Sequence, residues 1–130
     1  MAFTPVRFDD GKVTTVKQVA STTIAKFDAL VKDGNGLYSR ATSGTTKVNY
    51  VALQDSVIGA ITPPEILVLP THGVQFIADS AGNTAQTDVG LTLSLTDHDT
   101  VNDDATSPGV FFVEEIVGVS TAKTFRGYFA

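Results

Sequence analysis

Residues 29–40 read ALVKDGNGLYSR, and this stretch contains the plainest secondary-structure signal in the chain. Two short runs with apolar side chains, residues 29–32 and 37–40, flank the turn-forming sequence DGNG at residues 33–36. Glycine and asparagine tolerate the positive φ angles that a tight connection between antiparallel strands requires. The stretch therefore predicts a β-hairpin.

Short runs of similar size continue along the chain, separated by turn signals that contain Gly, Pro, Asp or Asn. Leu91-Thr92-Leu93-Ser94-Leu95 alternates strictly, as a half-buried strand does. Residues 66–69 are continuously apolar, which is consistent with a strand covered on both faces. We also predict strands at residues 48–53, 74–77, 110–113, 116–117 and 124–129. Many short strands between turns predict an all-β fold, a small single-domain β-sandwich or β-barrel.

Residues 16–31 allow two interpretations. Apolar side chains recur there at helical spacing, which would suit an amphipathic helix. The hydroxyl residues just before this stretch, Thr14-Thr15, and within it, Ser21-Thr22-Thr23, are mediocre helix formers. Their presence favours two strands. The helix remains the alternative.

Length and charge set the limits on domain number and binding partners. The 130 residues fit one domain, which we place at residues 12–130, with residues 1–11 as an extended N-terminal arm outside the core. The net charge is −5, and the nine basic residues occur singly, so the chain is not expected to bind nucleic acid. There is no cysteine and no apolar run long enough for a membrane helix. We expect no membrane association and no cofactor.

Acidic residues crowd together at residues 97–104, DHDTVNDD, within a long polar loop at residues 97–109 that we expect to be exposed. Clustered carboxylates can supply the oxygen ligands of Ca²⁺, which makes Asp97, Asp99, Asp103 and Asp104 a weak candidate metal site. The EF-hand spacing fails, because Val101 occupies a ligand position. A solvated acidic loop that discourages edge pairing between sheets is the alternative.

Catalytic signatures are missing from the sequence. It has no G-x-S-x-G nucleophile turn, and His72 lies between Pro70 and Gly73, where a turn residue is the simpler interpretation. Glu114 and Glu115 are adjacent in a predicted strand, so their side chains should point to opposite faces and cannot share one site. We therefore expect a non-enzymatic protein without catalytic residues.

Aromatic residues lie close to both ends of the chain. Phe125, Tyr128 and Phe129 either pack in the chain's own core or contact a neighbouring subunit, because chain ends tend to fray unless they are tied down. Our candidate contact residues for a larger assembly or another subunit are these three together with Phe3, Pro5 and Phe8 of the N-terminal arm.

Residues 21–55 resemble the capsid decoration (head cement) proteins of tailed bacteriophages. The resemblance lies in the sequence STTIAKFDALV at residues 21–31, the turn at residues 33–36, the hydroxyl-rich run ATSGTT at residues 41–46, and VALQD at residues 51–55. The later strands, at residues 68–71 and 110–118, look similar as well. The chain departs from the family pattern at two positions: Phe27 and Tyr50 stand where the family often has glycine.

The resemblance implies a β-sandwich or barrel, trimeric in many relatives, on the outer surface of the capsid. Such a protein is made in the host cytoplasm, binds the major capsid protein at capsomer junctions and stabilises the capsid. The arms could add strands to a partner. The alternative function is a glycan- or receptor-binding module of a phage head fibre, tail or spike.

Overall fold

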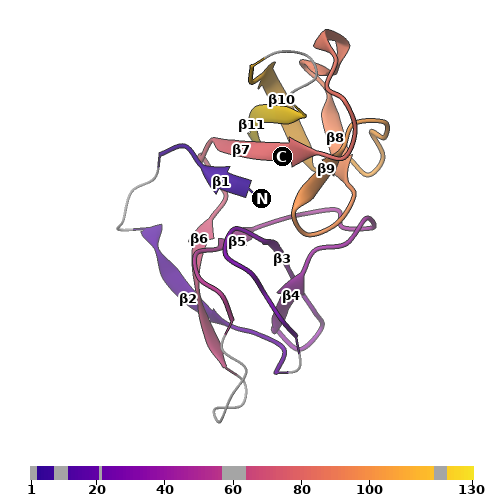
Figure 1. Cartoon of the computed structure of the whole chain (residues 1–130). Helices are drawn as coiled ribbons and strands as arrows, with labels where there is room; N and C mark the ends of the chain where they lie inside the picture. The colour runs from indigo at the N-terminus through magenta and orange to yellow at the C-terminus, as the bar shows by residue number, and fades with distance from the viewer. Residues whose placement is uncertain (1–2, 8–11, 21, 57–63, 119–122) are drawn as a thin grey trace.

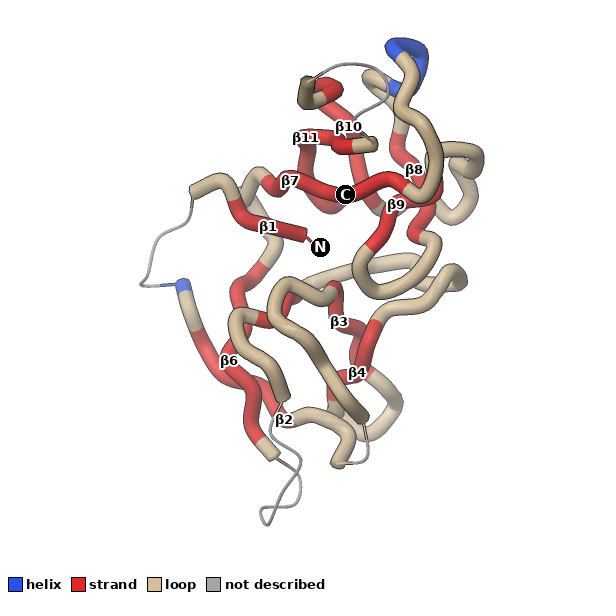
Figure 2. Tube along the Cα trace, viewed as in Figure 1, coloured by secondary structure: helices blue, strands red, loops and turns tan. Residues whose placement is uncertain are grey.

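A computed structural model describes residues 3–7, 12–20, 22–56, 64–118 and 123–130. This part of the chain is built from short strands, with a 3-10 turn at Gln86–Asp88 that is blue in Figure 2. None of the helical structure described there is long and apolar enough to cross a bilayer. The predicted all-β class is confirmed. The strands are β1 (Phe3–Pro5), β2 (Thr14–Lys17), β3 (Ala29–Lys32), β4 (Tyr38–Arg40), β5 (Tyr50–Ala52), β6 (Glu65–Pro70), β7 (Phe76–Ser80), β8 (Thr92–Leu95), β9 (Thr100–Asn102), β10 (Phe111–Ile116) and β11 (Thr124–Phe129).

Strands from the second half of the chain close into a small barrel, in the upper part of Figure 1. They follow the order β7-β11-β10-β8-β9, and β9 returns to pair in parallel with the end of β7. Closure removes the unpaired edges that an open sheet would expose. Strand β1 pairs with the first part of β7, next to the position of β9, so it extends the barrel as a sixth strand.

The remaining strands form a second, five-stranded sheet with the order β2-β6-β5-β3-β4. An isolated bridge between Gln18 and Tyr38 brings the two outer strands of this sheet together. The hydrogen bond from the Val19 N–H to the Tyr38 carbonyl (3.0 Å) accompanies that bridge. The two edge strands of this sheet, β2 and β4, are therefore connected to each other at this point.

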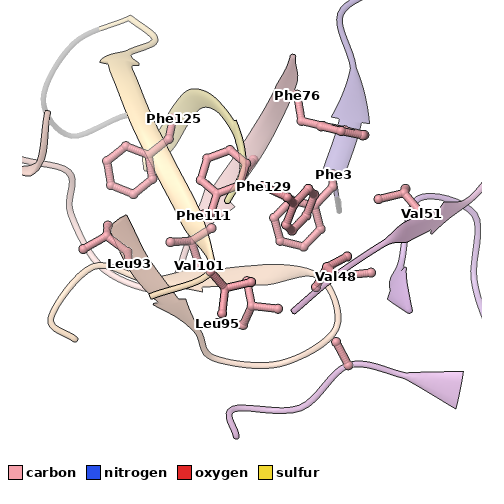
Figure 3. Packing of buried hydrophobic residues seen from close by; sticks show 14 of the residues in the cluster. Phe3, Val48, Val51, Phe76, Leu93, Leu95, Val101, Phe111, Phe125 and Phe129 are labelled. Atoms are coloured by element: carbon pink, nitrogen blue, oxygen red, sulfur yellow. The ribbon is translucent and has the colours of Figure 1, made fainter. Parts of the chain in front are cut away.

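One core joins the barrel to the second sheet. Phe3, Phe111 and Phe129 pack ring against ring, with centroids 4.8 to 5.8 Å apart. Val51 of β5 and Val48, in the segment before β5, complete the same cluster (Figure 3). The other face of the second sheet buries a smaller cluster of its own, which contains Ile24, Leu30, Ala52, Ile66 and Val68.

The hairpin predicted at residues 29–40 is confirmed as β3 and β4. Asp33 stabilises the turn, because its Oδ1 accepts hydrogen bonds from the N–H groups of Asn35 (2.8 Å) and Leu37 (3.0 Å). Gly36 has a φ of 79°, as expected for a tight connection. Upstream, β2 and β3 confirm the two-strand interpretation of residues 16–31, and the helical alternative is wrong for the described residues.

The N-terminal segment differs from the prediction of an arm outside the core. Phe3–Pro5 form β1, paired antiparallel with β7, and the Phe3 side chain is fully buried. The Phe3 N–H also donates to the carbonyl of Phe27 (3.0 Å). A ring as large as that of Phe3 gains more from burial against Phe111 and Phe129 than from exposure at a chain end. Phe8 lies outside the described residues.

The loop predicted at residues 97–109 is only partly exposed. Thr100–Asn102 form β9, the strand that closes the barrel, and Val101 is fully buried in the core. The apolar side chain that breaks the EF-hand pattern is therefore a core residue. The prediction of an exposed loop missed this strand because one valine among polar residues gives almost no periodic signal.

Candidate functional site

The four carboxylates predicted as a metal site do not come together as one group. Asp103 is turned toward another loop, where it accepts hydrogen bonds from the Gly82 N–H (2.7 Å) and the Ser80 hydroxyl (3.2 Å). Asp97 accepts the N–H of Asp99 (3.1 Å). Among the described residues, the potential metal ligands that lie within 4.8 Å of one another are Asp28, His98 and Asp99.

Asp28 is the centre of this cluster, although no pattern in the sequence marks it as a candidate. It lies in the turn before β3, and only 1% of its surface is exposed. Its Oδ2 accepts hydrogen bonds from the Ala25 N–H and from Nε of Arg40, both at 2.8 Å. Its Oδ1 lies 3.0 Å from Nδ1 of His98, on the loop that precedes β9. Both carboxylate oxygens are thus engaged within the protein.

This arrangement suits a structural role better than a cation site or acid–base catalysis. The Arg40 guanidinium already compensates the charge of Asp28, and a metal ion would have to displace it. The N–H of Ala29 also donates to the carbonyl of His98 (2.8 Å), so side chain and backbone together fasten the barrel loop to β3. The Asp28 cluster therefore joins the barrel to the second sheet.

Asp99 of the cluster interacts with Asp97, which lies outside the cluster on the same loop. Burial raises the pKa of Asp99, and its hydrogen bond with the Asp97 side chain raises it further. Burial also acts to raise the pKa of Asp97, but hydrogen bonds from Asp99 and Thr100 and the charge of His98 bring it below the ordinary value. The interaction between the two carboxyl groups therefore moves their pKa values in opposite directions.

Replacing Asp28 with asparagine is expected to destabilise the protein by about 2 kcal/mol, because the negative charge opposite Arg40 is lost and only one of the two acceptor oxygens remains. The partly exposed partners can regain water, which limits the loss. Chemical denaturation measures the effect. Asp104→Asn, at an exposed carboxylate, is the matched control and should change stability by less than about 0.5 kcal/mol. Equal effects of the two variants would contradict a central role for Asp28.

A second candidate is a row of outward-facing side chains that crosses the barrel. Phe112 pairs with Tyr128 on one side and with Thr92 on the other. Beyond Tyr128 the register continues to Gln75, whose carbonyl accepts the N–H of Val6 (2.8 Å). We call the residues Val6, Gln75, Tyr128, Phe112 and Thr92 the outer row.

Two of the three exposed large apolar side chains among the described residues belong to the outer row. The exposed large apolar side chains among the described residues are Val6 (47%), Tyr128 (41%) and Leu91 (39%). Val6 and Tyr128 belong to the outer row, and Leu91 adjoins Thr92. The rings of Phe112 and Tyr128 stack with centroids 5.3 Å apart and an interplanar angle of 22°. Apolar surface concentrated in this way marks an interaction site more often than scattered residues do.

A bulge in β10 brings charge beside the outer row. The register between β10 and β11 shifts between Val113 and Glu115, so Glu114 leaves the ladder. Glu114 and Glu115 are both exposed, whereas strict alternation predicted opposite faces. Glu115 forms an ion pair with Arg126, and Glu114 instead accepts a hydrogen bond from Nε2 of Gln75 (2.7 Å).

The predicted contact residues fall into two groups. Phe3, Phe125 and Phe129 are buried in the chain's own core, as in the alternative that we gave for the C-terminal aromatics. Packing explains this, because alternation in β1 and β11 points them inward. Pro5 is half-buried, and Tyr128 is the exposed one among the described members of the set. His72 is exposed in the turn between β6 and β7, as predicted.

Comparison with known proteins gives no relative. No family model matches the chain, and neither a curated protein nor a solved structure matches it. The functional argument therefore rests on the chain's own residues and on the resemblance of residues 21–55 to decoration proteins.

Proposed function

We propose that this chain is a structural virion protein that decorates a capsid and stabilises it by binding the major capsid protein at capsomer junctions. It acts without catalysis, on the outer surface of the capsid, and as a trimer like many of the proteins that it resembles. The observation that carries the proposal is the outer row, which presents Val6 and Tyr128 to solvent on the face of a closed barrel. Exposed aromatic residues in such a setting are frequent anchors of protein interfaces.

A backbone angle supports the resemblance on which the capsid assignment depends. Phe27 has a φ of 72°, in the left-handed region that glycine adopts without steric cost. Decoration proteins often have glycine at the matching position. The backbone here is held by two hydrogen bonds, from Phe27 N–H to the Ala52 carbonyl (2.7 Å) and from Phe3 N–H to the Phe27 carbonyl (3.0 Å). Phe27 thus adopts a backbone angle that a glycine would adopt without steric cost.

Co-sedimentation with empty capsids of the virus that encodes the chain tests the proposal. The wild-type protein should bind saturably, and Tyr128→Ala should weaken binding at least about tenfold, since an interface anchor contributes about 2 kcal/mol. Thr15→Ala, at an exposed position on β2, is the control and should bind like the wild type. If the wild-type chain does not co-sediment with capsids but binds a glycan saturably, the result would favour the fibre, tail or spike alternative instead.

A further inference from the structure

We propose that the outer row, at the depression beside Tyr128, binds an arginine side chain of the protein partner. The depression has a volume of about 470 Å³ and is lined by His72, Gly73, Val74, Gln75, Glu114, Tyr128 and Phe129. The inference names the group that the partner presents, and it rests on the proposed function for the identity of that partner.

The carboxylate of Glu114 supplies the charge. Its hydrogen-bond partner, the amide of Gln75, is neutral, and no ion pair of Glu114 occurs among the described residues. The neighbouring Glu115 differs, because Arg126 already pairs with it. The bulge therefore presents one uncompensated carboxylate at the depression, in a chain of net charge −5. This charge favours a cation and disfavours phosphate, sulfate or a carboxylate.

The ring of Tyr128 supplies a surface on which a flat cation can stack. Phe112, on the neighbouring strand, stacks against this ring and fixes its orientation. Gln75 and the turn at residues 72–74 lie on the opposite side, toward β7, where they line the depression. A guanidinium is planar, binds a carboxylate through two parallel hydrogen bonds and stacks on aromatic faces, whereas an ammonium does only part of this. Glu114 and Tyr128 together therefore favour arginine.

A peptide titration of the full-length chain, followed by NMR of the ¹⁵N-labelled protein, tests the depression without any capsid. The probe is a capped Gly-Arg-Gly peptide, and the comparison is Gly-citrulline-Gly, in which a neutral urea replaces the guanidinium. We expect the arginine peptide to shift the amide signals of residues 72–75, 114 and 128, and to bind about three- to tenfold more tightly than the citrulline peptide. Glu114→Gln should remove that preference, and Glu115→Gln should keep it.

Three outcomes would overturn the inference: equal affinity for the two peptides, shifts confined to other residues, or an unchanged preference in Glu114→Gln. A trimer of N-acetylglucosamine that shifts the same signals while the arginine peptide does not would assign the depression to a sugar. The dispersion of the NMR spectrum shows whether each variant is folded. If the chain binds capsids through Tyr128 but does not bind the arginine peptide, only this inference is wrong. If the chain binds the arginine peptide but does not bind capsids, only the proposed function is wrong.

Discussion

Replacing Gly127 with alanine is expected to destabilise the protein by about 3 kcal/mol, because β10 leaves no room for a side chain there. Gly127 lies in β11, opposite Val113, at the point where the bulge begins. A Cβ atom built at this position would overlap the carbonyl oxygen of Phe112 and would lie 3.0 Å from the Phe111 ring. The obstacle is backbone, so it cannot be relieved by rotation of a side chain, and β10 and β11 must separate.

Chemical denaturation of Gly127→Ala beside Gly34→Ala measures this effect. Gly34 lies in the exposed turn of the hairpin, and a Cβ atom there would have no neighbour within 4 Å. That control should differ from the wild type by less than about 0.5 kcal/mol. If both variants were equally stable, the close approach of β10 and β11 at Gly127 would not exist in the protein.

Phe3→Ala is expected to cost about 3–5 kcal/mol, the range found for large aromatic side chains removed from a core. Phe3 is fully buried and contacts the rings of Phe111 and Phe129, with centroids 5.8 and 4.8 Å away. The loss would combine the apolar area returned to water with the cavity left between the barrel and the second sheet. Thermal and chemical unfolding of the purified variant report it.

Thr4→Ala is the matched control for Phe3, since Thr4 is the next residue of β1 and is only half-buried. We expect it to change the free energy of unfolding by less than about 1 kcal/mol. A Phe3→Ala protein as stable as this control would restore the view of the N-terminal segment as an arm outside the core.

Much of the fold was predictable because most strands carry a periodic signal. Leu93 and Leu95 point into the core as the alternation predicted, but Leu91 is exposed, and Ser94 is buried with its hydroxyl donating to the Pro108 carbonyl (2.6 Å). The continuous run at residues 66–69 contributes to two different clusters. The exceptions are strands of three residues. Phe3–Pro5 and Thr100–Asn102 are too short to show a period, and each contributes a single buried apolar side chain.

The candidate sites were harder to predict because they depend on contacts that are distant in sequence. Asp28 follows Phe27 in what reads as an ordinary polar turn, yet its partners are 12 residues away (Arg40) and 70 residues away (His98). Glu114 illustrates a second limit. A bulge adds one residue to a strand without a sequence signature, so alternation assigned Glu114 and Glu115 to opposite faces.

The position of β7 has a consequence for the order in which the protein can fold during synthesis. β7 lies between β1 and β11, so the barrel combines residues 3–5 with residues 124–129. The second sheet is complete once Pro70 has left the ribosome, and it can assemble while translation continues. During that time the Phe3 ring lacks its partners, Phe111 and Phe129, because β10 and β11 have not yet been synthesised. Every nascent chain thus leaves Phe3 without its Phe129 partner until β11 has emerged from the ribosome, which makes chaperone binding at that stage an advantage.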